Sequence, residues 1–217
     1  MKDYTLKYGK GSVTFALDEA HVTELYGTPV PKIDDIRAAL YATLSSPVSH
    51  EPLESWVNPG DKVALIVSDM SRFWMRQDLV VPHIISYLTD KCDVNQNNIT
   101  IIIANGTHPG GAENELRTLV TDGVYDRIRV VNHDCQAKDL VYIGTTSLGT
   151  EVRINPIAAN ADKVIMLGAC TYHVMAGYGG GRKSILPGIS GLETIRQNHL
   201  HSLDLLAPRS NPLIGNG

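Results

Sequence analysis

The sequence has few cysteines, no long apolar run and no excess of basic residues. Its three cysteines are far apart and show no C-x-x-C spacing (Cys92, Cys135 and Cys170), which argues against a disulfide framework and against a cysteine zinc site. No apolar stretch approaches the roughly 20 residues that cross a bilayer, and the N-terminus lacks the apolar segment of a signal peptide. We therefore expect a soluble, cytoplasmic protein that has no membrane partner.

The charge balance also limits the choice of partners. The chain has 19 Lys and Arg against 23 Asp and Glu, a formal net charge of -4, and the two signs are mixed along the sequence. Because no basic stripe is present, nucleic acid is not an expected partner. A chain of 217 residues can bury about 70% of its unfolded surface, so it can form a core without disulfides or a structural metal.

The order of apolar segments predicts the fold class. Continuous apolar runs at 61–69, 98–105 and 161–169 are typical of buried strands. An amphipathic helical pattern at 78–91 lies between the first two runs, and another at 112–120 follows the second. This alternation predicts an α/β, Rossmann-like domain with a mainly parallel sheet flanked by helices.

Further elements complete the expected architecture. Polar and apolar residues alternate around Gly9 and Gly11, which predicts an N-terminal β-hairpin over 4–17. The other expected elements are helices at 33–44 and 191–203, a strand at 127–132, and two strands at 139–144 and 149–155 that pair with each other.

Polar side chains follow three of the apolar runs. Asp69 and Arg72 come after the first, His108 follows the second in a Gly-rich loop, and His173 follows the last, with Lys183 one loop further on. Ligands of open α/β sheets bind outside the carboxyl ends of the strands. If the strands are parallel, these side chains converge on one rim of the sheet.

Each of these residues also has a structural interpretation. His108 could be a surface-loop histidine, but the Gly-rich loop leaves its imidazole accessible and favours a function. His173 could be a core histidine, and its position near His108 and Lys183 favours a function. Asp69 and Arg72 could form a local ion pair, or Arg72 could bind an anion in bidentate fashion, and both interpretations stay open.

The segment "GYGGGRKS", 177–184, is close to a phosphate-binding loop but departs from it. Lys183 and Ser184 stand where a Walker loop has them, whereas Arg182 takes the place of the second glycine. The three glycines could simply make a tight turn. Two cations beside a backbone that a ligand can approach closely instead favour a phosphate or carboxylate site formed by the same segment (Gly179, Gly180, Gly181, Arg182, Lys183 and Ser184).

The remaining histidines carry weaker signals. His199 lies in the expected helix at 191–203, where a cation near the C-terminal turns is stabilising, and taken alone this capping role is favoured. We interpret the other histidines as structural or solvated: His21, His50, His83, His133 and His201.

Four segments in this order resemble the nickel-pincer lactate racemase family. They are "SDMSR" (68–72), "ANGTHPGG" (104–111), "TYHVMAGYGGGRKSILPGISG" (171–191) and "IRQNH" (195–199). The resemblance covers essentially the whole chain and implies that residues 1–217 form the N-terminal catalytic and cofactor-binding domain of such an enzyme. It also implies the cofactor, which is nickel held by pyridinium-3,5-bisthiocarboxylic acid mononucleotide.

The resemblance assigns a role to each candidate residue. Lys183 would be the covalent tether of the nucleotide and His199 a nickel ligand. His108 and His173 would be the acid/base pair. The supporting residues would be Asp69 and Arg72, with Arg72 on the substrate carboxylate, and the cofactor-binding segment Gly179, Gly180, Gly181, Arg182 and Ser184.

The implied activity is racemisation or epimerisation of lactate or a related 2-hydroxy acid. The Cα proton of such an acid is very weakly acidic, whereas loss of hydride to an electron-poor ring produces a 2-oxo acid. The hydroxyl proton must leave at the same time, and a histidine with a pKa of about 6.5 suits that transfer. His108 and His173 would supply one base for each enantiomer.

The resemblance further implies a C-terminal domain, absent from these 217 residues, that contributes polar groups including a lysine, so the chain alone is expected to be inactive. Expected partners are the hydroxy acid and the proteins that build and insert the cofactor. One alternative is a relative that acts on a larger hydroxy acid or does net redox chemistry. Another is a non-catalytic nucleotide- or anion-binding module, which has no need of His108, His173 and His199.

Overall fold

The computed structural model describes residues 1–173 and 176–201, and the chain divides into two compact units, Met1–Asp34 and Asp35–Gly217. The first unit is the expected hairpin. Strands β1 (Lys2–Tyr8) and β2 (Gly11–Leu17) pair antiparallel without interruption. Gly9 turns the chain with a φ of +58°, and a short helix η1 (Glu19–His21) follows.

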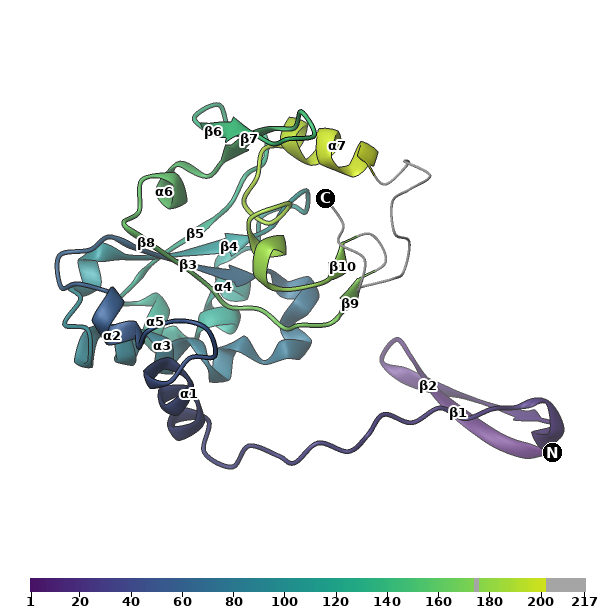
Figure 1. Ribbon diagram of the computed structural model, residues 1–217. Coiled ribbons are helices and arrows are strands. Elements are labelled where there is room, and N and C mark those ends of the chain that lie inside the picture. Colours follow the sequence, from purple (N-terminus) through teal and green to yellow (C-terminus); the bar gives the residue numbers. More distant parts are fainter. Residues whose placement is uncertain (174–175, 202–217) are drawn as a thin grey trace. The chain divides into compact units, whose positions relative to one another are not determined.

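The second unit is built on a parallel four-stranded sheet. Its strands are β3 (Val63–Ser68), β4 (Ile99–Ala104), β5 (Arg129–Asn132) and β8 (Lys163–Met166), in the order β5-β4-β3-β8 (Figure 1). This sheet confirms the expected α/β class. The chain runs from β3 to β4 and β5 on one side and then returns to place β8 on the other side of β3. The strand order therefore reverses beside β3, which is where open α/β sheets bind ligands.

Helices cover one face of the sheet. They are α1 (Ile36–Ser45), α2 (Leu53–Trp56), α3 (Val81–Asp90), α4 (Glu113–Val120) and α5 (Asp122–Tyr125). Leu65, Val67, Ile101 and Ile103 point to this face and pack with residues from all five helices. Because the strands are buried on both faces, they appear in the sequence as continuous apolar runs.

The opposite face is covered by shorter elements. Ala64, Ile66 and Ile102 pack there against Ile154, Ala158 and Ile189. Ala158 belongs to the one-turn helix α6 (Pro156–Ala159), and Ile154 ends β7 (Glu151–Ile154), which pairs antiparallel with β6 (Val141–Thr145) as expected. Helix α7 (Leu192–Leu200) corresponds to the expected helix at 191–203, whose last two positions lie outside the described residues.

The smallest elements had no clear sequence signal because they contain too few residues to show a period. They are η2 (Met70–Met75), η3 (Gln77–Leu79), η4 (Gln96–Asn98), η5 (Gly181–Ser184) and the paired strands β9 (Tyr172–His173) and β10 (Gly177–Tyr178). Within the described part of the chain, no helix combines the length and the apolar character needed to cross a membrane.

Candidate active site

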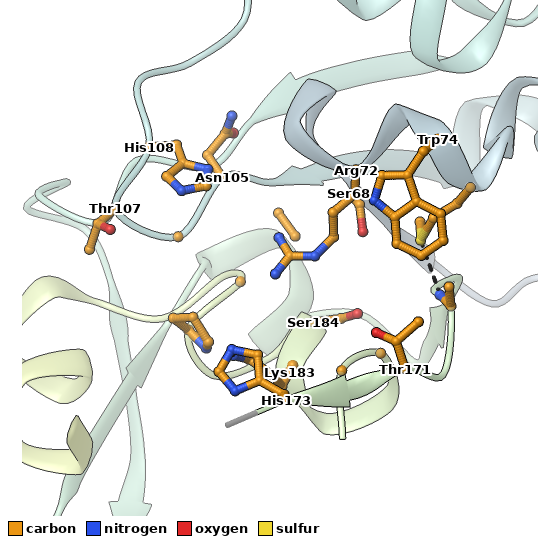
Figure 2. A pocket seen from close by; sticks show the side chains of 18 residues that line it. Ser68, Arg72, Trp74, Asn105, Thr107, His108, Thr171, His173, Lys183 and Ser184 are labelled. Carbon is orange, nitrogen blue, oxygen red and sulfur yellow. Dashed lines mark hydrogen bonds between the residues drawn. The ribbon is translucent and has the colours of Figure 1, made fainter. Parts of the chain in front are cut away.

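A pocket of about 230 Å³ opens beyond the carboxyl ends of β3, β4 and β8 (Figure 2). Its lining includes Arg72 after β3, His108 after β4 and His173 after β8. Lys183 and Ser184, from η5, complete the same lining. The strand ends thus bring together side chains that are more than 100 positions apart in the sequence, because parallel strands have their carboxyl ends on one edge.

His108 is oriented by a carboxylate. Its Nδ1 lies 2.5 Å from Asp69 Oδ2, and Asp69 is only 7% exposed. Asp69 also caps η2, since its Oδ1 accepts a hydrogen bond from the backbone N–H of Ser71 at 3.2 Å. A carboxylate accepts only, so the proton of the neutral His108 ring lies on Nδ1 and Nε2 is left as a proton acceptor.

His173 is instead paired with an amine. Lys183 Nζ lies 2.8 Å from His173 Nε2, and the backbone N–H of Ala176 donates to His173 Nδ1 at 3.2 Å. Burial lowers the pKa of Lys183, and the charge of Arg72 lowers it further. Burial likewise lowers the pKa of His173, with additional contributions from Lys183, Arg72 and His199. Both groups are therefore shifted toward their neutral forms, in which Nε2–H of the imidazole donates to the lysine amine.

Arg72 supplies positive charge to the middle of the pocket. It belongs to η2, and its guanidinium points into the cavity between the side that carries His108 and the side that carries Trp74 (Figure 2). A guanidinium here presents a fork of donors that matches a carboxylate.

The glycine segment shapes the wall around Lys183. Gly179 and Gly180 line the pocket, and Gly180 has a φ of +71° with a hypothetical Cβ only 2.6 Å from the carbonyl oxygen of Ala169. A side chain at this position would separate the two backbone segments, so the close approach requires glycine. Gly181 and Arg182 lie outside the lining, and Arg182 is exposed with Nη2 3.5 Å from the Ala176 carbonyl oxygen.

His199 also lies outside the pocket lining. It sits half-buried on α7, with Nδ1 2.7 Å from the carbonyl oxygen of Ile195, and its charge contributes to the lowered pKa of His173. Among the residues that the structure describes, no group of three or more His, Cys, Asp or Glu side chains is placed to hold a metal ion. The predicted nickel site needs only one ligand from these residues, His199, and it stays a prediction.

Asn132, the last residue of β5, and His133, which follows it, connect the walls of the pocket. Asn132 clamps the His108 loop, because its side chain accepts from the Gly111 N–H at 3.1 Å and donates to the Gly111 carbonyl at 2.8 Å. His133 is buried; its N–H donates to Asn105 Oδ1 at 3.1 Å, and its Nε2 bonds the Ser190 carbonyl at 2.9 Å. The structural interpretation of His133 is confirmed, and its bonds tie the His108 loop to the chain that follows Lys183.

Other lining residues were missed in the sequence. Trp74, Met75, Asn105 and Thr171 all face the pocket. Each lies within or beside a segment that was recognised for its charged residues, so proximity to those segments was the available signal. Side-chain direction on a 3-10 helix or a loop does not follow a period that the sequence reveals.

A family model describing the lactate racemase N-terminal domain matches residues 8–209. The chain belongs to this family. It is 27% identical over 208 residues to the lactate racemase of Thermoanaerobacterium thermosaccharolyticum, covering 92% of this chain and 47% of the relative. It is also 27% identical over 199 residues to that of Lactiplantibacillus plantarum, covering 89% and 46%. The chain thus spans about half the length of the curated relatives it matches.

Solved structures share the fold. The lactate racemase apoprotein of T. thermosaccharolyticum superimposes with a TM-score of 0.82 and 24% identity, over 97% of this chain and 49% of the other. A protein from Thermotoga maritima gives a TM-score of 0.62 at 18% identity, over 82% and 44%. These likenesses support the architecture of the domain.

Proposed function

We propose that this chain carries the cofactor of a racemase or epimerase that acts on lactate or a related 2-hydroxy acid. The observation that supports the proposal is one pocket with two histidines of different pairing. His108 is bonded to Asp69 and His173 to Lys183, and Arg72 points between them.

The proposed cofactor is nickel held by pyridinium-3,5-bisthiocarboxylic acid mononucleotide, and the residues around Lys183 fit it. A lysine must lose its proton before it can act as a nucleophile, and the lowered pKa of Lys183 favours that form. The close-packed glycine backbone brings Lys183 into the pocket. His199 would supply a nickel ligand, and Ser184 and Arg182 would lie near the nucleotide.

When bound, the cofactor would supply an electron-poor ring as a reversible hydride acceptor for the substrate Cα. The protein residues handle the remaining charges. Arg72 holds the carboxylate, and whichever histidine faces the hydroxyl takes its proton as the carbon becomes a 2-oxo group. Inversion would need hydride on the other face of the 2-oxo acid and a proton from the other histidine. The first histidine would then hold an extra proton and the second would lack one, so exchange with solvent must restore both before the next turnover.

The pairing of His173 with Lys183 makes the non-catalytic alternative less favourable. A lysine that binds phosphate as a point charge should stay protonated, whereas burial and Arg72 lower the pKa of Lys183. Calorimetry with ATP tests this alternative. Tight binding that is lost in Lys183→Ala would favour an anion-binding module over the racemase.

Two further features of the proposal concern its setting. Cys92, Cys135 and Cys170 are free thiols, which supports a reducing compartment such as the cytoplasm. The proposed partners are the small hydroxy acid and the proteins that build and insert the cofactor.

Intact-mass measurement tests the proposed function directly. The full-length protein, co-expressed with the cofactor-biosynthesis enzymes, should carry an adduct on Lys183 and nickel in about equal amount. Lys183→Ala should lose the adduct, the nickel and the racemisation of lactate. Lys91→Ala, which replaces an exposed lysine at the end of α3 outside the pocket lining, is the matched control and should keep the covalent adduct. A fully active enzyme with an unmodified Lys183 would contradict the proposal.

A further inference from the structure

Trp74 stands exposed on a wall of the pocket. In η2, Phe73 packs against the apolar core, while Arg72, Trp74 and Met75 turn to the cavity. Trp74 keeps 62% of its surface accessible. Figure 2 places it beside Arg72 and near Thr171, on the side of the cavity away from His108.

The two tryptophans of the chain differ in their surroundings. Trp56 is 36% exposed, with the Lys163 ammonium 4.7 Å from its ring centroid and the His50 ring 5.6 Å away. Within residues 1–173 and 176–201, no aromatic ring or cation stacks on Trp74. A large exposed apolar side chain in a pocket with convergent polar groups is a feature of ligand-binding sites.

The neighbours of Trp74 limit what can bind to it. An indole face attracts cations, but the Arg72 guanidinium shares this wall, so a second positive charge would be repelled. A methyl group, as in lactate, covers only a small part of an indole. A flat, uncharged ring covers it fully and gains from aromatic stacking. Met75 adds a polarisable apolar contact, and its position is held because its Sδ accepts from the Ala169 N–H at 3.1 Å.

We propose that Trp74 is a specificity-determining residue that binds an aromatic side chain of the substrate, so that the preferred 2-hydroxy acids are 3-aryl-2-hydroxypropanoates rather than lactate. Trp74 lies two residues after Arg72 on the same short helix. The carboxylate can therefore bind the guanidinium while the aryl ring covers the indole and the hydroxyl faces the histidines. This inference rests on the proposed racemase function and deepens it by naming a substrate class.

Fluorescence tests the subsite without any need for turnover. In a Trp56→Phe background, Trp74 is the only tryptophan, because the sequence contains two. Titration of this protein with 3-phenyl-2-hydroxypropanoate should change the emission of Trp74 and give a dissociation constant about tenfold lower than that for lactate. A response to nicotinic acid mononucleotide without any response to the aryl acid would assign Trp74 to the cofactor ring and overturn the proposal.

Kinetics of the cofactor-loaded full-length enzyme separate the substrate preference from the reaction itself. Trp74→Ala should lower kcat/KM for the phenyl substrate about tenfold, mainly by raising KM, and should lower kcat/KM for lactate by a clearly smaller factor. Trp74→Phe keeps an aromatic ring and should restore most of the loss. Equal losses of kcat/KM for both substrates, or equal kcat/KM values for both in the unaltered enzyme, would overturn the proposed role of Trp74. If the loaded enzyme racemises neither acid, the proposed function fails, and the fluorescence titration still decides whether Trp74 binds the aryl ring.

Discussion

The two walls of the pocket place a histidine in opposite electrostatic surroundings. After β4, His108 bonds the buried carboxylate of Asp69 at 2.5 Å. In β9, His173 bonds the amine of Lys183 at 2.8 Å, and burial, together with the charge of that amine, lowers the pKa of His173. The proposed racemase reaction needs comparable proton transfer on two faces of the substrate, yet the two histidines have unequal electrostatic surroundings.

Covalent attachment at Lys183 would reduce this inequality. An amide-type nitrogen carries no positive charge, so its formation removes one cause of the lowered pKa of His173. Burial and the charges of Arg72 and His199 remain. We therefore predict that the electrostatic surroundings of His108 and His173 become more alike when the cofactor is bound.

Replacing either histidine tests whether the two walls have equivalent roles. His108→Gln and His173→Gln should each lower kcat about 10²- to 10⁴-fold in the loaded enzyme, because each removes a positioned proton acceptor. Both directions of lactate interconversion should suffer, since every inversion uses both histidines. Polarimetry of each enantiomer measures this effect. Loss in one direction only would contradict reversible catalysis at a single site, and loss from one variant alone would show that only one wall is catalytic.

The bond between Asp69 and His108 can be weakened while the imidazole is kept. Asp69→Asn should lower kcat roughly tenfold to a hundredfold, because the amide orients the ring less strongly and removes the negative charge. Adduct formation at Lys183 should persist, as measured by intact mass. An effect on kcat as large as that of His108→Gln would instead give Asp69 a direct part in the chemistry.

The glycine segment of the second wall offers a matched pair of variants. Gly180→Ala should destabilise the protein by about 2 kcal/mol, since φ is +71° and the new Cβ would lie 2.6 Å from the Ala169 carbonyl oxygen. Gly181→Ala also has a positive φ but meets no atom within 4 Å, so it should cost only about 1 kcal/mol. Urea unfolding measures both. Equal losses of stability in the two variants would mean that the close approach of Gly180 to Ala169 does not add to the cost of the substitution.

The charge of Lys183 can be removed without the cofactor. Lys183→Met should raise the pKa of His173, because one of the positive charges that disfavour imidazolium is gone. NMR titration of the imidazole protons in the apoprotein reads this shift. Arg182→Met removes an exposed charge that is not among the causes of the lowered pKa and serves as the control. An unchanged pKa of His173 in Lys183→Met would show that Lys183 is not one of the groups that lower it.

His133 allows a test of the hydrogen bonds that connect the two walls of the pocket. Burial lowers its pKa below the usual value of 6.5, so the unfolded chain binds a proton before the folded one does. Stability from this residue is complete above about pH 6.5 and falls as the pH drops from there toward the folded pKa. Melting temperatures from pH 7.5 to 5 should decline less steeply for His133→Gln than for the parent protein. His21→Gln, at an exposed site, should leave the slope unchanged.

The fold was largely predictable because buried strands and amphipathic helices have distinct periods. The hairpin, β3, β4, β5, β8 and the pairing of β6 with β7 all appear where the sequence placed them. The site was less predictable. Proximity to strand ends pointed to His108, His173 and Lys183. The sequence pattern placed both Arg182 and Lys183 at an anion site, whereas of these two only Lys183 lines the pocket.

The sequence alone determined the α/β class, the edge of the sheet that carries the polar residues, and the family to which those residues belong. These properties depend on local periodicity and on segments of fixed spacing. Only the tertiary structure decided that Asp69 partners His108 across 39 positions and that Lys183 partners His173. It also turned Trp74 toward the cavity. Partner choice depends on side-chain direction and burial, and both are set by contacts between segments whose arrangement local sequence does not encode.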